Sequence, residues 1–336
     1  MKKGIAVAGA MVMDIIKLID QFPQRHGLIH IEEKSYSPGG AVCNTGRDLA
    51  ALDPQMPVRL VGMVGEDAEG EEMLRQLRAY PNIDVSRILR QGQTSFTDVL
   101  TEKDSRARTF LFFGGANDVF DRQHVDVENL NCDLFHVGYI LLLATLDQED
   151  PQYGTRMARL LHDVQAQGIK TSVDVVSEVG DRYRRLVPPS LKYADYFIVN
   201  EIEAGKTVGI DLRDAQDNLL TQRIPLVLNR LREMGVKEWV VIHAPEGGFG
   251  LDREGHYVAL GSLDLPQGFI VGTVGAGDAF CAGVLHAAYK GESMEQGIQD
   301  GIAAAAQSLS AAGASEAMVP IQQVRELYQR MPKKSV

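Results

Sequence analysis

The chain has 336 residues, of which 45% are hydrophobic and 24% are charged, a composition typical of a globular protein that folds in water. Its formal net charge of −11 argues against a nucleic-acid or anionic-membrane partner, because both need a basic surface. The cysteines are widely spaced, odd in number and without CxxC spacing, so they predict neither a disulfide framework nor a zinc site and fit a reducing compartment.

The N-terminal stretch MKKGIAVAGAMVM has the two lysines and the apolar run of a short signal sequence. Asp14 follows it directly, however, and no small-residue cleavage site is suitably placed. We therefore interpret residues 5–10 as a buried first strand. No apolar run reaches the roughly 18 residues that a membrane span needs, so we predict a cytoplasmic protein with no membrane partner.

Short apolar runs alternate with amphipathic helical patterns along the chain. The predicted strands are residues 5–10, 58–65, 134–140, 170–176, 196–200 and 239–244. The predicted helices are residues 69–80, 153–168 and 224–235, and the chain is mostly helical after residue 275. The alternation predicts an α/β fold whose central sheet is mostly parallel and covered by helices on both faces.

Two regions depart from this alternation, residues 15–37 and approximately 92–114. They mix charged and β-prone residues, as in TSFTDVLTEKDSRARTFLFF, which fits a sheet with one face in water. We predict a small antiparallel flap, or lid, made from these two insertions. No linker, repeat or low-complexity tract is visible, so residues 1–336 are expected to form a single domain.

The stretch GTVGAGDAF, residues 272–280, is read as the end of an apolar strand, a glycine-rich turn and the start of a helix. Gly275, Ala276 and Gly277 would then lie at a helix N-terminus, where backbone N–H groups have no intrahelical partner and bind anions. Asp278 would lie beside the same anion, where a carboxylate can accept the proton of an alcohol that attacks a phosphoryl group. The stretch therefore predicts a phosphate-binding turn with Asp278 as base and the three amides as anion hole.

Other glycine motifs do not fit this stretch. A Rossmann GxGxxG motif needs a glycine where Phe280 stands, and the P-loop pattern GxxxxGK[ST] is absent. The GKT at residues 205–207 has Asn200 in place of the first P-loop glycine. The remaining alternative is a helix whose first turn carries an aspartate only because the helix dipole favours it.

The stretch resembles the C-terminal signature of the ribokinase-like, or PfkB, carbohydrate kinases, D-T-x-G-A-G-D-x-F. A second family signature, a glycine pair, is matched by PGGAVCNTGRDLAAL at residues 38–52. Weaker family features follow in order at residues 61–70, 114–118, 172–176, 199–204 and 313–320. The resemblance covers nearly the whole chain. It implies a ribokinase-like three-layer α/β/α fold with a small β lid and an ATP- and Mg²⁺-dependent kinase for a hydroxymethyl group of a small sugar or related polyol.

The resemblance also implies a sugar site at the glycine pair. Asp14, at the end of the first strand, would hold substrate hydroxyls, since a carboxylate accepts two hydrogen bonds. Gly39 and Gly40 would let the backbone lie against the sugar, and Asn44 would offer it both a donor and an acceptor.

The nucleotide residues are implied in the same way. NEIE resembles the family's N-x-x-E motif, so Asn200 and Glu203 would organise Mg²⁺, its waters and the triphosphate, with Glu203 acting through a water. Thr273 matches the threonine of the C-terminal signature and is assigned to the nucleotide.

The stretch IHAPEGG, residues 242–248, departs from the family's nucleotide-binding turn, usually T-x-G-x-x-G, so only Gly248 is carried over. His243 stays open between a phosphate or ribose contact and a plain strand-end residue.

Further departures and features concern the substrate, the cation and assembly. The glycine pair continues as NTGR, which is reminiscent of nucleoside kinases of the same superfamily, so a nucleoside kinase and a non-catalytic sugar-sensing relative remain alternatives. Gly272 replaces the aspartate that begins the signature and that holds potassium in many relatives, so we expect weak potassium dependence. The apolar run TFLFF, residues 109–113, predicts a homodimer through the lid, since exposed apolar patches usually mark interfaces.

Overall fold

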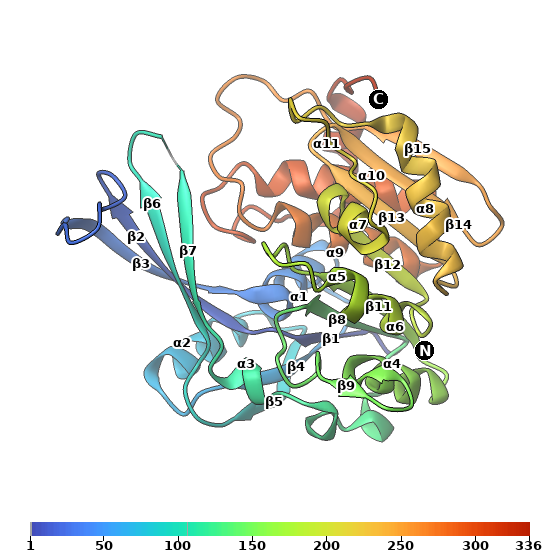
Figure 1. Cartoon of the computed structure of the whole chain (residues 1–336), viewed down its shortest axis with the longest axis horizontal. Coiled ribbons are helices and arrows are strands. Elements are labelled where there is room, and N and C mark those ends of the chain that lie inside the picture. The colour runs from blue at the N-terminus through green and yellow to red at the C-terminus, as the bar shows by residue number, and fades with distance from the viewer. Residues whose placement is uncertain (1, 106) are drawn as a thin grey trace.

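The computed structural model describes residues 2–105 and 107–336. In this part of the chain nine strands form one sheet in the order β15-β14-β13-β12-β11-β8-β1-β4-β5 (Figure 1). Every neighbouring pair from β13 to β5 is parallel, and the edge strands β14 and β15 are antiparallel. The strands are β1 Ile5–Gly9, β4 Val58–Val64, β5 Ile83–Arg90, β8 Leu134–Ile140, β11 Lys170–Val175, β12 Tyr196–Asn200, β13 Trp239–Ala244, β14 Gly247–Asp252 and β15 Tyr257–Gly261.

Helices cover both faces of this sheet. The longer helices are α1 Gly40–Leu52, α2 Ala68–Leu77, α4 Arg156–Ala166, α7 Glu201–Val208, α8 Ile224–Glu233, α9 Ala276–Lys290, α10 Met294–Ser308 and α11 Ile321–Arg330. The short elements are α3 Ala116–Val119, α5 Tyr183–Leu186, α6 Pro188–Leu191, the 3₁₀ turns η1 Arg122–His124, η2 Val127–Asn129 and η3 Thr221–Arg223, and the hairpin of β9 Glu149–Asp150 and β10 Gly154–Thr155.

Two hydrophobic cores lie on opposite faces of the sheet. Along β1, Ala6 and Ala8 belong to the core that contains α4 and α8, whereas Ile5 and Val7 belong to the core that contains α1, α9 and α10. A strand buried on both faces needs a continuous apolar run, and this is why the predicted strands could be found in the sequence. The arrangement is the predicted three-layer α/β/α fold.

A second, four-stranded sheet extends from the body of the molecule (Figure 1). It has the order β3-β2-β6-β7, with β2 Val12–Ile19, β3 Ile31–Gly39, β6 Phe96–Glu102 and β7 Arg108–Phe113. The predicted antiparallel arrangement is wrong for the central pair, because β2 and β6 are parallel. β2 follows β1 and β6 follows β5, and both therefore start from the carboxyl ends of parallel strands of the main sheet. They run in the same direction, and β3 and β7 pair with them antiparallel.

The apolar strand predicted ahead of the glycine-rich turn does not form. Ile270 and Val271 are 55% and 61% exposed, and the backbone N–H groups of Val271 and Gly272 donate to the carbonyl oxygen of Leu309 at the end of α10. This short apolar run therefore binds a helix end instead of a neighbouring strand. Among the residues that the structure describes, no helix is both long and apolar enough to cross a membrane.

Candidate active site

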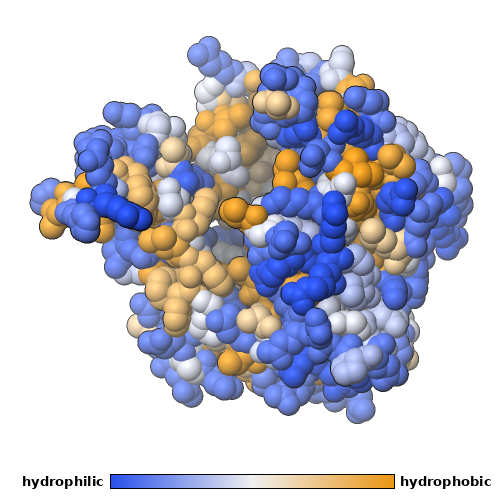
Figure 2. All heavy atoms as spheres, viewed as in Figure 1, coloured by the Kyte–Doolittle hydropathy of each residue, from blue (hydrophilic) through white to orange (hydrophobic). Residues whose placement is uncertain are grey.

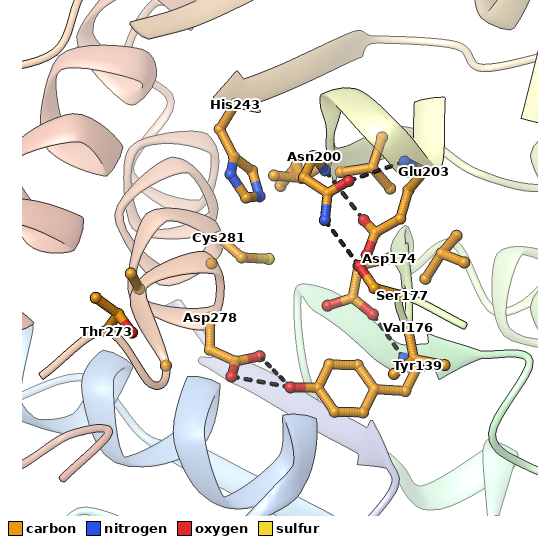
Figure 3. Close-up of a pocket in the computed structure, with 16 residues that line it drawn as sticks. Tyr139, Asp174, Val176, Ser177, Asn200, Glu203, His243, Thr273, Asp278 and Cys281 are labelled. Carbon is orange, nitrogen blue, oxygen red and sulfur yellow. Dashed lines mark hydrogen bonds between the residues drawn. The ribbon is translucent and has the colours of Figure 1, made fainter. Parts of the chain in front are cut away.

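Helix α9 begins at the glycine-rich turn and presents its first residues to a cavity of about 270 Å³ (Figure 3). Gly275, Ala276 and Gly277 all line this cavity. Gly275 has a φ of +78°, and a Cβ there would lie 2.5 Å from the Cβ of Ala314, so the turn requires glycine. Since the first N–H groups of a helix have no intrahelical partner, those at the start of α9 can bind an anion in the cavity.

Asp278 lies in the first turn of α9, lines the same cavity and is only 7% exposed. The amide of Asn44 on α1 donates to its Oδ2 at 2.9 Å, which joins a predicted sugar residue to the predicted base. Burial first, and then the charge of Asp174, raises the pKa of Asp278 to about 6, although its hydrogen bonds oppose the rise. A carboxylate with such a pKa can accept a proton near neutral pH.

The sequence did not single out two residues that meet at this site, Tyr139 and Asp174. The Tyr139 hydroxyl lies 3.0 Å from Oδ1 and 2.9 Å from Oδ2 of Asp278 (Figure 3). The backbone N–H of Tyr139 donates to Asp174 Oδ1 at 2.6 Å. A signal for Asp174 existed, because a carboxylate inside the apolar run SVDVV is costly to bury without a partner. Tyr139 had no such signal.

Asn200 and Glu203 form a reciprocal cap at the N-terminus of α7. The Asn200 side chain accepts from the Glu203 N–H at 2.8 Å, and Glu203 accepts from the Asn200 N–H at 3.0 Å. Glu203 also accepts from the Ser177 hydroxyl at 2.7 Å. Burial, followed by the charges of Asp174 and Glu201, raises the pKa of Glu203 to about 8. Glu203 is thus a buried carboxyl that lines the cavity.

His136, Asp174 and Cys281 form a buried cluster, of which Asp174 and Cys281 line the cavity. Potential ligand atoms of the three side chains lie within 4.8 Å of one another. His136 Nε2 is 3.6 Å from Asp174 Oδ2 and 4.0 Å from the Cys281 sulfur, and its Nδ1 is 3.1 Å from the Ser172 hydroxyl. These residue types can hold a metal ion, although the cysteine thiol stays protonated without one, because burial holds its pKa well above the usual range.

The predicted sugar residues lie where the small sheet meets α1. Asp14 is in β2, opposite Ser37 of β3 and Thr97 of β6, and not at the end of the first strand as predicted, because β1 already ends at Gly9. A Cβ at Gly39 would collide with the Asp14 carboxylate, which explains the first glycine of the pair.

Gly40 begins α1, and its backbone is left-handed, with a φ of +79°. A Cβ there would lie 2.5 Å from the Ala10 carbonyl oxygen, so the second glycine of the pair is also required.

A second cavity of about 640 Å³ adjoins the first. The two share Asn200, His243, Thr273, Ala276 and Gly277, and the larger one is otherwise mostly apolar. Its further lining includes Ala244, Leu263, Leu265, Ile302, Ala305, Ala306 and Leu309. A site that is polar at one end and apolar at the other fits a ligand with a charged group joined to a flat apolar group.

His243 and Gly248 are placed differently from each other. His243 lies between the two cavities, where burial lowers its pKa to about 4, so its ring is neutral and can contact a ligand without adding charge. Gly248 lines neither cavity, and its lack of a Cβ is explained by Ile298, whose Cγ2 would lie 2.6 Å away. The neighbouring Gly247 lines the larger cavity.

Gly272, which replaces an acidic residue in the signature, lies against the loop after α10. A Cβ at this position would lie 2.6 Å from the carbonyl oxygen of Ala311 and 2.9 Å from that of Ala312. A larger residue would have to displace this backbone. The local packing therefore leaves no room for a side-chain cation ligand at Gly272.

The chain is similar in sequence and in fold to known proteins. Residues 2–322 match the model of the pfkB family carbohydrate kinases. The chain is 26% identical to the ATP-dependent ribose-1-phosphate kinase of Halopiger xanaduensis over 83% of this chain and 82% of the relative. It is 24% identical to the ribokinase of Arabidopsis thaliana over 94% of this chain and 78% of that protein.

The solved structures include one of Arabidopsis thaliana ribokinase complexed with ribose and ATP. It superposes with a TM-score of 0.79 at 21% identity and covers 98% of this chain and 99% of that one, so it shows the same fold. The family match extends over nearly the whole chain and includes the glycine-rich turn, Asp278 and the glycine pair. The chain belongs to the PfkB family of carbohydrate kinases, phosphotransferases that act on an alcohol group.

Proposed function

We propose that this chain transfers the γ-phosphoryl group of ATP to a hydroxymethyl group of a small sugar, with Asp278 as the base and the Gly275–Gly277 backbone as the anion hole. The observation that carries the proposal is the placement of Asp278. It is a buried carboxyl with a pKa raised to about 6, in the first turn of a helix whose first residues line the same cavity. The group that accepts the proton and the backbone N–H groups that would bind the phosphate thus lie within one helical turn. Transfer of a phosphoryl group to an alcohol requires both.

The paired cavities support ATP as the phosphoryl donor. The larger, mostly apolar cavity suits the adenine ring, and the smaller one suits the phosphates at the start of α9. His243, Thr273 and Asn200 line both cavities, where a ribose and the first phosphates would lie. The similar ribokinase from Arabidopsis thaliana has been solved with ribose and ATP, which agrees with this assignment.

The charges of the smaller cavity fit Mg²⁺. Asp174, Glu203 and Asp278 line it together, and the charge of Asp174 helps to raise the pKa of the other two. A divalent cation reduces the repulsion between such carboxylates, and oxygen is the ligand that Mg²⁺ prefers. Bound with ATP, the ion would neutralise phosphate charge, while Asp174, Glu203 and Asn200 would hold it or its waters.

The sugar would lie between Asp278 and the small sheet. Asn44 is 4% exposed, and its Oδ1 has no hydrogen-bond partner among the described residues, although its Nδ2 binds Asp278. A buried acceptor without a partner is costly, and a substrate hydroxyl would satisfy it. Asp14 would accept hydrogen bonds from further hydroxyls, since its carboxylate lies beside Gly39, at the start of the helix that carries Asn44. The small sheet would then act as a lid over the bound sugar.

The exposed edge of the small sheet supports a homodimer. Phe110, Leu111, Phe112 and Phe113 of the edge strand β7 are all exposed, and Figure 2 shows apolar atoms along this part of the molecule. An exposed apolar edge strand is a site for pairing with another chain. We infer that a second copy covers it.

The cysteines are free and buried, which agrees with a reducing, cytoplasmic location.

ADP release measured with a panel of acceptors tests this function. The panel should contain ribose, fructose, a sugar acid, ribose 1-phosphate and nucleosides, each with MgATP. Turnover on a sugar is expected, and a strong preference for nucleosides would overturn the choice of substrate. Absence of turnover on every compound, together with thermal stabilisation by a sugar, would overturn the catalytic role and indicate a sensor.

A further inference from the structure

The hydroxyl of Tyr139 binds the very group that the reaction needs to be free. It lies 3.0 Å from Oδ1 and 2.9 Å from Oδ2 of Asp278, and thus faces both oxygens of the carboxylate (Figure 3). Asn44 already donates to Oδ2. A base must lie within about 2.6–3.2 Å of the oxygen whose proton it takes, so the Tyr139 hydroxyl occupies the place of an attacking hydroxyl.

The backbone holds Tyr139 in this position at a cost that most residues avoid. Tyr139 has a φ of +70° and Leu141 a φ of +83°, in the left-handed region where glycine is the usual residue. Hydrogen bonds fix the turn, from the Tyr139 N–H to Asp174 at 2.6 Å and from the Leu141 N–H to Asp147 at 3.2 Å. Because the backbone suits glycine, the presence of tyrosine points to a role for its side chain.

The Tyr139 hydroxyl stays a hydrogen-bond donor to the Asp278 carboxylate. A tyrosine hydroxyl keeps its proton at neutral pH, so the Tyr139 hydroxyl can donate to the carboxylate. While it donates to Asp278, a water molecule cannot hand its own proton to the same face of the carboxylate. The cavity could otherwise hold such a water directly beside the anion hole, since Asp278 and Gly277 line it together.

We propose that Tyr139 makes the enzyme discriminate between a sugar and water, because its hydroxyl occupies the acceptor position on Asp278 until a sugar displaces it. This inference rests on the proposed role of Asp278 as base. A sugar can donate further hydroxyls to Oδ1 of Asn44, which is unpartnered among the described residues, and to the Asp14 carboxylate, and these hydrogen bonds offset the lost Tyr139–Asp278 bond. A single water molecule has only two O–H groups, so it cannot donate to Asp278 and also to both of these acceptors. ATP is therefore spared from hydrolysis when no sugar is bound.

The test is ADP release from MgATP without any acceptor. Tyr139→Phe removes the hydroxyl and keeps the ring, whereas Tyr139→Gly removes the whole side chain and suits the left-handed backbone. Both variants should hydrolyse ATP about tenfold faster than the wild type, or more, since a positioned base accelerates proton transfer by roughly 10²–10⁴-fold. Tyr196→Phe is the matched control, because Tyr196 is also buried but begins β12 at the opposite end of the strand from the site. Thermal unfolding of each variant reports its folding.

The double variant Tyr139→Phe, Asp278→Asn separates this inference from the proposed function. It should lose the gained hydrolysis. If it hydrolyses as fast as Tyr139→Phe alone, Asp278 is not the base and the proposed function fails. If Asp278→Asn abolishes sugar phosphorylation but neither Tyr139 variant exceeds wild-type hydrolysis, only the role of Tyr139 is overturned. A gain in Tyr139→Gly alone would assign water exclusion to the ring and overturn the role of the hydroxyl.

The KM for a sugar found in the panel gives a second readout. Displacement predicts that Tyr139→Phe lowers this KM, because the sugar no longer competes with the phenol. A higher KM would mean that Tyr139 holds the sugar, which contradicts displacement.

Discussion

Sugar phosphorylation should fall steeply in acid, because two carboxyl groups beside the proposed acceptor position have raised pKa values. Burial, and then the charge of Asp278, raises the pKa of Asp14 to about 7. Burial and the charge of Asp174 raise the pKa of Asp278 to about 6. Both groups act as carboxylates in the proposed reaction, Asp14 toward substrate hydroxyls and Asp278 toward the transferred proton. At saturating MgATP the kcat/KM for the sugar reports the enzyme that holds ATP but no sugar, and it therefore depends on both carboxylates.

The size of the effect follows from these pKa values. Between pH 8 and pH 5 the ionised fraction of Asp278 falls roughly tenfold and that of Asp14 roughly a hundredfold. The kcat/KM for the sugar should therefore fall about a thousandfold in the wild type over this range. In Asp14→Asn one group no longer titrates, so kcat/KM should fall only about tenfold from its own value at pH 8.

Initial rates of ADP release, measured from pH 8 to pH 5 at saturating MgATP and fixed ionic strength, give both profiles. The ionisation of ATP is common to the two proteins and cancels in the comparison. Thermal unfolding at each pH shows whether the protein stays folded. A wild-type profile that is flat to pH 5 would refute the raised pKa of Asp278, and an unchanged slope in Asp14→Asn would refute the part assigned to Asp14.

Other changes test the sugar site, the cation and the assembly. Asp14→Ala should lower kcat/KM for the sugar by a factor that corresponds to about 1–3 kcal/mol of transition-state stabilisation, and it should leave the KM for ATP near its wild-type value. An equal loss for both substrates would indicate a structural role. Turnover in potassium chloride and in choline chloride should differ by less than about tenfold, or roughly 1.4 kcal/mol, because Gly272 supplies no side-chain ligand. Greater activation would show that a potassium site survives. Light scattering should give twice the chain mass of 36.9 kDa, and a monomeric mass would contradict a dimer through β7.

The main sheet could be predicted because its strands are buried on both faces. The predicted strands agree with β1, β4, β8, β11, β12 and β13 to within one residue at each end. The run at Ile270 and Val271 looked equally apolar, yet it binds the end of α10. Apolar character alone does not say whether a segment has a neighbouring strand to pair with.

The site was predictable where its residues share one short motif. The turn from Gly275 to Asp278 forms a single structural unit, so its spacing carries its geometry. Tyr139 could not be found in this way, because it meets Asp278 across 139 residues of sequence and only through an unusual backbone turn. Gly248 is a different case, since packing against Ile298 explains the glycine and the residue lines neither cavity.

The most direct test of the proposed mechanism is kcat of Asp278→Asn with the sugar that the panel identifies. The asparagine is nearly isosteric, so the contact with Asn44 and the shape of the cavity should persist, but it cannot accept a proton. We predict that kcat falls by roughly 10²–10⁴-fold while ATP binding changes little. A variant that keeps more than about half of the wild-type kcat would contradict the role of Asp278 as the base.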